Sequence, residues 1–152
     1  MPFCLDTSFL VGAWVRNYPP DVFPGLWDAL DELIEAEEII CPDEVLVELG
    51  AKEDELHAWA EARPKLFVPL DHAQMEATTA ILKDFPRLVG ELADRNRADP
   101  FVIALAVVRG HTVVTEERGG SERRPKIPFV CAEMEIKCMN TLEFIRSQRL
   151  SF

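Results

Sequence analysis

Short apolar runs alternate along the chain with stretches in which apolar side chains recur at helical spacing. Leu26, Leu30 and Ile34 share one face of a predicted helix, and Val45 and Leu49 share a face of another. This alternation is typical of an α/β domain with a central, mainly parallel sheet. The predicted strands are 3–5, 38–41, 66–68, 112–115 and 129–131.

A buried helix is predicted from Pro100 onward, because residues 101–108 are apolar almost all round. Gly110 is placed to end it. The helical pattern that follows Asp71 is interrupted by Pro86, which predicts two helices there. A polar, glycine-led loop is expected at 119–126.

The length of 152 residues suits one compact domain spanning 1–152. No apolar run is long enough to cross a bilayer, and the first residues lack the basic lead-in of a signal peptide. We therefore expect a cytoplasmic protein without a membrane segment. The cysteines lack the close spacing of a zinc site and are expected to be buried free thiols. They are Cys4, Cys41, Cys131 and Cys138.

The formal net charge of -11 argues against a broad basic surface for nucleic acid. A nuclease remains possible if several acids converge on one pocket, because bound divalent cations would then offset their charge and contact the phosphate. The alternative is that an acidic surface keeps the protein soluble or attracts a basic partner.

Acidic residues follow the predicted strands at the positions where parallel α/β sheets build their sites. Asp6 comes directly after strand 3–5, with the hydroxyl residues Thr7 and Ser8 beside it. Taken alone, this triplet is better explained as the N-cap of the next helix, a role worth about 1 kcal/mol. The functional interpretation of Asp6 depends on the other acids.

Three further positions complete the pattern. Glu48 shares a helix face with Glu44, which lies in a first turn where a dipole role explains it. Asp99 precedes Pro100 and the most apolar helix, and could be only its N-cap. Glu116 and Glu117 follow strand 112–115 and could be only a charged turn. Each signal is weak alone, but the joint pattern outweighs the separate structural explanations.

These residues resemble the PIN-domain ribonucleases, which include the VapC-type toxins of toxin–antitoxin pairs. The resemblance spans nearly the whole chain, and segment 5–10 looks like the family's opening strand-plus-acid motif. Segments 47–49 and 98–100 look like its second and third acidic positions, and 114–117 looks like its strand ending in Thr, any residue, then an acid. That spacing selects Glu117 over Glu116, although the family usually has Asp there.

The resemblance implies a three-layer α/β/α PIN-like domain with an acidic pocket for Mg²⁺ or Mn²⁺. Asp6 and Asp99 would be direct metal ligands, and Glu48 and Glu117 would bind through water or orient the attacking water. The hydroxyls of Thr7, Ser8 and Thr115 would hold a substrate phosphate or a metal-bound water. The implied activity is metal-dependent endoribonuclease cleavage of RNA, in a toxin that has an antitoxin partner.

Some alternatives stay open. Arg118, Arg123, Arg124 and Lys126 could contact RNA, but a solvated loop explains them better. Aromatic residues between Trp14 and Trp27 suggest a homodimer face. A response-regulator receiver domain is disfavoured because its phospho-accepting Asp and late Lys are not found. A catalytically weak or inactive PIN-fold module that binds a protein partner is the main alternative.

Overall fold

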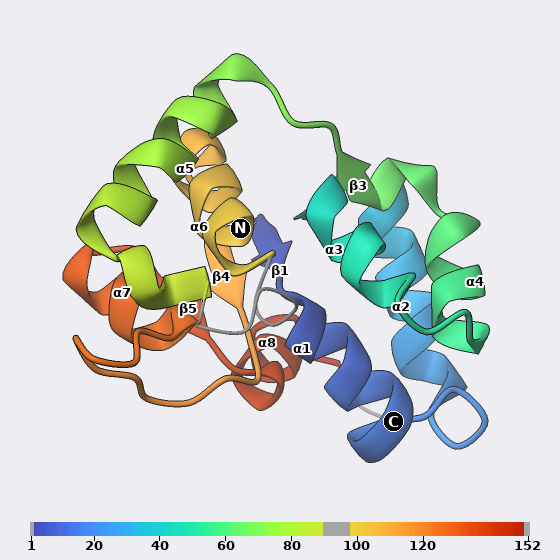
Figure 1. The fold of residues 1–152 in the computed structure, drawn as a ribbon. Coiled ribbons are helices and arrows are strands. Elements are labelled where there is room, and N and C mark those ends of the chain that lie inside the picture. Colours follow the sequence, from blue (N-terminus) through green and yellow to red (C-terminus); the bar gives the residue numbers. More distant parts are fainter. Residues whose placement is uncertain (1, 90–97, 151–152) are drawn as a thin grey trace.

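The computed structural model describes residues 2–89 and 98–150. Within these residues, five parallel strands form a sheet with the order β3-β2-β1-β4-β5 (Figure 1). The predicted α/β fold with a central parallel sheet is therefore confirmed. The strands are β1 (Phe3–Leu5), β2 (Ile39–Pro42), β3 (Phe67–Val68), β4 (Thr112–Val114) and β5 (Cys138–Met139).

Helices cover both faces of the sheet and complete three layers. In Figure 1, α5, α6 and α7 lie to the left of β1, and α2, α3 and α4 lie to its right. The helical segments are α1 (Thr7–Val11), the π-helix η1 (Gly12–Asn17), α2 (Pro24–Glu35), α3 (Asp43–Leu49), α4 (Glu55–Glu61), η2 (Pro64–Leu66), α5 (His72–Asp84), η3 (Pro86–Val89), α6 (Asp99–Arg109), α7 (Ile127–Glu133) and α8 (Thr141–Ser147).

Helix α6 is the buried helix that the sequence predicts. It packs against β1, β2 and β4, and the residues from Val102 to Ala106 are at most 1% exposed. Gly110 ends it with a φ of 68°, in the left-handed region that glycine adopts without strain. The sequence allowed Asp99 to be only the N-cap of this helix. In the structure the N-cap position is occupied by Ala98 instead. Asp99 lies one residue later, in the first turn.

The face of the sheet opposite to α6 is covered by α8 and by a group of tryptophans. Phe144 of α8 makes edge-to-face contacts with Phe3 and Phe9, at ring-centroid distances of 5.0 and 5.5 Å. Trp27 packs between Trp14 and Trp59 and is only 5% exposed. The aromatic group that suggested a homodimer face is therefore largely used within the chain, and a homodimer stays a proposal.

Two sequence predictions differ from the structure. Residues 129–131 were expected to be a strand, but they lie in α7, which begins after Lys126 with Pro128 in its first turn. The fifth strand is instead Cys138–Met139, which is too short to give a periodic signal. Of the helix expected after Pro86, residues 86–89 form a 3-10 helix, and its continuation lies outside the described residues.

All four cysteines are free, and Cys4, Cys41 and Cys131 are buried, as predicted, whereas Cys138 is half-buried. Burial raises the pKa of the Cys4 thiol, which is consistent with an inert apolar side chain. Across residues 2–89 and 98–150, no helix combines the length and the hydropathy that crossing a bilayer requires.

We expect Phe144→Ala to lower the free energy of unfolding by about 3–5 kcal/mol, because it empties a fully buried site between two rings. Urea denaturation monitored by circular dichroism measures this. Leu142→Ala is the matched control on the same helix, since Leu142 is 47% exposed and its truncation should change stability by less than about 1 kcal/mol. Equal losses in the two variants would contradict this account of how α8 is anchored.

Candidate functional site

The site lies at the carboxyl ends of β1 and β4, which are neighbours in the sheet. The chain leaves β1 toward β2 on one side, whereas β4 lies on the other side, so the strand order reverses between them. Open α/β sheets form their binding crevices at such a reversal. Asp6 follows β1 directly, and Thr115, Glu116 and Glu117 follow β4.

Asp6 is held by hydrogen bonds to both of its carboxylate oxygens. The backbone N–H of Thr7 donates to Oδ1 at 2.7 Å, while the hydroxyls of Ser8 and Thr115 donate to Oδ2 at 2.7 and 2.8 Å. Its own backbone N–H donates to the Val114 carbonyl at 3.0 Å. Asp6 is thus both the N-cap of α1 and the link between β1 and β4. The capping interpretation and the site interpretation are compatible.

Asp99 and Glu117 converge on Asp6. One carboxylate oxygen of each residue lies within 4.8 Å of the others, which makes a group that could hold a metal ion in the described part of the chain. Asp99 comes from the first turn of α6 and is 3% exposed. Glu117 Oε2 accepts the backbone N–H of Ile127 at 3.1 Å, which fixes its side chain at the start of α7.

Glu48 lies at the edge of this group rather than inside it. Its Oε1 accepts the Thr7 hydroxyl at 2.8 Å. Burial raises its pKa, while hydrogen bonds from the Thr7 hydroxyl and the Ala98 backbone lower it. Glu48 therefore connects α3 to the start of α1 and to the residue that caps α6. It faces the charge of Glu117 without belonging to the group of three.

The two adjacent glutamates after β4 point to different partners. Glu117 joins Asp6 and Asp99, whereas Glu116 Oε1 accepts the backbone N–H of Thr141 at 2.9 Å, at the start of α8. An added Cβ on Gly12 would lie 3.3 Å from the Glu116 side chain, so glycine there leaves room for it. Glu116 and Glu117 are adjacent in sequence, but their carboxylates have different partners in the structure.

The group of three concentrates negative charge in a region with little water. Burial, aided by the charge of Glu117, raises the pKa of Asp6 from 3.8 to about 6, against hydrogen bonds from Ser8 and Thr115 that lower it. Burial also raises the pKa of Asp99 to about 10, with repulsion from Asp6 and Glu117 adding to the effect. Both carboxyls are therefore destabilised as anions by their surroundings.

A divalent cation fits these residues. Among the described residues, Asp99 Oδ2 is buried and has no hydrogen-bond partner. A buried carboxylate oxygen without a donor is unfavourable unless it is protonated or bound to a cation. Hard cations such as Mg²⁺ and Mn²⁺ prefer carboxylate oxygens and need only a few of them. The unpartnered oxygen, the repulsion between the acids and the carboxylate ligand type all favour a bound divalent cation.

The three hydroxyls expected to hold a substrate phosphate or a metal-bound water donate to carboxylates in this structure. Ser8 and Thr115 donate to Asp6, and Thr7 donates to Glu48. Ser8 Oγ and Thr115 Oγ1 also accept the backbone N–H groups of Glu116 and Glu117, at 2.9 and 3.0 Å. Their geometry is that of groups that orient the acids. The four basic residues of the neighbouring loop are all exposed: Arg118, Arg123, Arg124 and Lys126.

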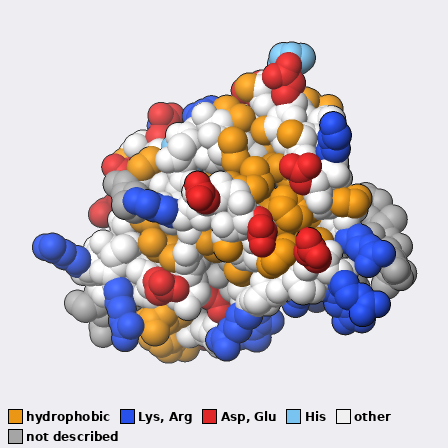
Figure 2. All heavy atoms as spheres, turned by 90° about the vertical axis from the view of Figure 1, so that its left-hand side faces the viewer, with side chains coloured by type: hydrophobic (Ala, Val, Ile, Leu, Met, Phe, Trp, Pro, Cys, Tyr) orange, Lys and Arg blue, Asp and Glu red, His pale blue; other side chains and the backbone are white. Residues whose placement is uncertain are grey.

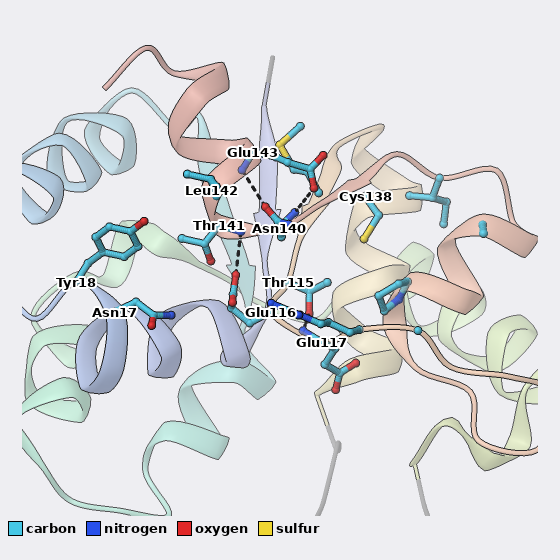
Figure 3. A pocket seen from close by; sticks show the side chains of 16 residues that line it. Asn17, Tyr18, Thr115, Glu116, Glu117, Cys138, Asn140, Thr141, Leu142 and Glu143 are labelled. Atoms are coloured by element: carbon cyan, nitrogen blue, oxygen red, sulfur yellow. Dashed lines mark hydrogen bonds between the residues drawn. The ribbon is translucent and has the colours of Figure 1, made fainter. Parts of the chain in front are cut away.

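A cavity of about 1000 Å³ opens beside the carboxylates, on the side of β4 and β5 (Figure 3). Thr115 and Glu117 belong both to its lining and to the site. No functional pattern in the sequence selected its other walls, which come from η1, α7, β5 and α8. One signal was available: Asn140 and Glu143 have the spacing of a capping box, which marks the start of α8. Lining residues from these elements include Asn17, Tyr18, Pro128, Met139, Asn140, Thr141 and Leu142.

Residues 3–152 match a protein family described as a domain of unknown function (DUF4411). The chain belongs to this family. A search of curated proteins found no match. The family description carries no activity, so the chemistry has to be argued from the geometry.

The chain also resembles a chain in the crystal structure of VapBC2 from Rickettsia felis bound to a DNA fragment from their promoter. The two chains share 15% sequence identity with a TM-score of 0.56, over 92% of this chain and 98% of the other. At this identity the likeness concerns the fold, and it supports the three-layer PIN-like architecture.

We expect Asp99→Asn to become increasingly more stable than the metal-free wild type as the pH rises above about 4. Folded Asp99 and Asp6 keep protons that the unfolded chain releases near 3.8, so unfolding releases protons and is favoured by rising pH. Most of the Asp6 contribution falls between pH 4 and about 6, and that of Asp99 extends to higher pH. Asn carries no charge and removes the Asp99 part.

The measurement is urea denaturation of both proteins in EDTA at steps from pH 4 to pH 9. Asp28→Asn, which neutralises an exposed acid on α2 outside the group of three, should track the wild type. A difference between Asp99→Asn and wild type that stays constant or shrinks as the pH rises would contradict a raised Asp99 pKa.

Proposed function

We propose that the protein is a divalent-metal-dependent endoribonuclease that hydrolyses RNA phosphodiester bonds. One observation carries the proposal: Asp6, Asp99 and Glu117 converge at the sheet reversal, and the buried Asp99 Oδ2 has no partner in the described chain. The resemblance of the four acidic segments to PIN-domain ribonucleases supports it, as does the PIN-like fold.

In the proposed mechanism, Asp6, Asp99 and Glu117 hold Mg²⁺ or Mn²⁺. When bound, the cation would supply Lewis-acid stabilisation of the charge that develops on the phosphoryl oxygens. Asp6 and Asp99 remain the principal ligands expected from sequence. Glu117 was expected from sequence to act through water. It is proposed here as a direct ligand, because one of its carboxylate oxygens lies within 4.8 Å of an oxygen of Asp6 and an oxygen of Asp99.

Glu48 is the proposed general base. It lies beside the group of three and burial raises its pKa above the ordinary value, which suits a carboxylate that accepts a proton from water during attack on phosphorus. The water oxygen bonds to phosphorus as the bond from phosphorus to the leaving ribose oxygen breaks, Glu48 takes the proton of the attacking water, and the leaving oxygen takes up a proton from solvent. Thr7 holds Glu48 in place through its hydroxyl.

Ser8 and Thr115 are proposed as positioning residues for Asp6, and the exposed basic loop is proposed to contact the RNA backbone. Groups that orient metal-binding carboxylates usually change activity 10–100-fold when removed. The loop begins immediately after Glu117 and contains four of the sixteen basic residues of an otherwise acidic chain. The basic character of this loop contrasts with the net charge of -11 of the whole chain.

RNA cleavage should require Mg²⁺ or Mn²⁺ and stop in EDTA. We expect Asp6→Asn and Asp99→Asn to reduce kcat by more than about a hundredfold, and Thr115→Val by roughly ten- to a hundredfold. Single-turnover cleavage of labelled RNA measures these effects, and circular dichroism checks folding. Glu44→Gln is the control that should retain activity. Equal cleavage in EDTA, or no cleavage together with no metal binding by calorimetry, would overturn the enzyme proposal.

A protein partner is proposed because apolar side chains lie exposed on the α5–α6 face. Met75 of α5 is 47% exposed, and Val107 and Val108 of α6 are 43% and 37% exposed. Figure 2, which views the molecule from this side, shows hydrophobic side chains gathered at the centre with acidic side chains among them. An antitoxin with basic residues around an apolar segment would complement this face. The same observation favours the alternative of a PIN-fold interaction module.

Met75→Lys together with Val107→Lys should abolish partner capture while leaving RNA cleavage within about twofold of wild type. Co-expression with a neighbouring short reading frame, followed by co-purification, tests this. Val47→Lys, on exposed α3, is the control that should still bind. Capture that survives the double substitution would show that the partner uses another surface, and cleavage absent from every preparation would favour the interaction module.

A further inference from the structure

We propose that the cavity beside the carboxylates binds an unpaired nucleobase that carries an exocyclic amino group: adenine, cytosine or guanine in preference to uracil. The proposal rests on the proposed function, because it names the part of the RNA that this side of the same site receives. It starts from the cavity volume of about 1000 Å³, at the upper end of the range for small-ligand pockets, which is enough for a nucleotide with its sugar.

One hydroxyl in the cavity wall has no hydrogen-bond partner within the described residues. Thr141 lines the cavity and is 3% exposed, yet its Oγ1 has no hydrogen-bond partner among residues 2–89 and 98–150. Its backbone N–H is satisfied by Glu116. A buried hydroxyl left unpaired is unfavourable, so such a group at a cavity wall is suited to a ligand that supplies the missing bond.

The charges of the walls exclude a phosphate as the group that enters. Glu116, Glu117 and Glu143 line the cavity against one cation, Arg118. Carboxylates accept hydrogen bonds but cannot donate them, so they would repel a phosphate and attract an N–H donor. Glu116 and Glu143 each use Oε1 for a backbone N–H, of Thr141 and Asn140. Within the described chain, Oε2 of both residues accepts no hydrogen bond, and the two N–H donors of an exocyclic amino group would suit them better than the single N–H of uracil.

The remaining walls suit the flat, apolar faces of a base. Tyr18 offers an aromatic ring, and Met139 and Leu142 offer apolar surface from β5 and α8. In Figure 3, Asn17 and Tyr18 lie on one side of the cavity and the Thr141 side chain lies between Tyr18 and the Glu116 carboxylate. Stacking on an aromatic ring and hydrogen bonds to the base edge are how proteins bind unpaired bases.

The position of the cavity relates the base to the reaction. Glu117 and Thr115 belong to both the cavity lining and the carboxylate site, so a base held by Glu116 and Glu143 would leave its phosphate beside Arg118, next to the site where the proposed cation would offset the carboxylates. The base bound here would then belong to a nucleotide next to the cleaved bond. Duplex RNA would be excluded, because a paired base cannot offer its edge to Glu116 and Thr141.

The test measures binding of AMP, CMP, GMP, UMP and ribose 5-phosphate to the full chain in EDTA, by nuclear magnetic resonance titration of backbone amides. We expect AMP, CMP and GMP to shift the amides of Asn17, Tyr18 and Thr141, UMP to bind at least about threefold more weakly, and ribose 5-phosphate to leave them unchanged. Thr141→Val should weaken binding roughly three- to tenfold, the effect of one lost hydrogen bond.

Thr141→Val separates binding from structure, because it removes only an unpaired hydroxyl and should leave the melting temperature unchanged or raised. The matched control is Thr78→Val on α5. Thr78 is also buried, but its hydroxyl donates to the Gln74 carbonyl at 2.7 Å, so this variant should lose stability and keep nucleotide affinity. Asn17→Ala, at an exposed position of the other wall, gives a second variant that should weaken binding without unfolding.

Equal shifts with ribose 5-phosphate, equal affinity for UMP, or unchanged affinity in both Thr141→Val and Asn17→Ala would overturn the base pocket. These outcomes are independent of the metal, because the titrations contain none. Binding without RNA cleavage would leave the pocket standing and remove the nuclease. Metal-dependent cleavage whose rate is the same for all four bases, in wild type and in Thr141→Val, would do the reverse.

Discussion

The hydrogen bonds that converge on Asp6 are the constraint on which the rest of the site depends. This one carboxylate caps α1 through the Thr7 N–H and accepts the hydroxyls of Ser8 and Thr115, so it joins the ends of β1 and β4. The position of Glu117 follows from that junction, because its backbone N–H donates to Thr115. Asp99 is then brought in by α6, whose apolar surface leaves it little freedom in the core.

The same arrangement is unfavourable for the folded chain on its own. Asp6 and Asp99 are buried beside the half-buried Glu117, and their raised pKa values reflect this burial first and the repulsion between the acids second. Hydroxyl and backbone donors relieve part of it, but not at Asp99 Oδ2. Local instability that surrounding packing maintains is common at functional sites. Here the buried α6 and the rings around Phe144 supply that packing.

Sequence reasoning predicted most of the fold because strong local patterns carried it. The buried α6 and its glycine end, the strand before Asp6 and the strand before Glu116 all have unambiguous signals. The fifth strand was predicted at 129–131 instead of Cys138–Met139 because an apolar run fits a strand or a helix equally well. Pro128, in the first turn of α7, favours the helix that the structure has. A two-residue strand exists only because β4 is there to pair with it.

The candidate acids could be named from sequence, but their arrangement could not. Spacing selected Glu117 over Glu116, while the reason they differ lies in partners from distant elements: Ile127 for one and Thr141 for the other. The cavity could not be predicted from the sequence for the same reason. Asn17 and Thr141 are more than a hundred positions apart, and no local pattern connects them.

The hydrogen bond from Thr115 to Asp6 spans 109 positions of sequence, and this separation has a consequence for biosynthesis. β1 leaves the ribosome before its neighbour β4 has been made, because more than a hundred residues separate Asp6 from Thr115. Contacts between residues so far apart in sequence form late in folding, because closing a long loop is entropically unfavourable. A nascent chain therefore carries Asp6 without Glu117 throughout the synthesis of the intervening residues. If the site cleaves RNA, a chain that has not yet reached Glu117 lacks the complete site and cannot attack the message from which it is being translated.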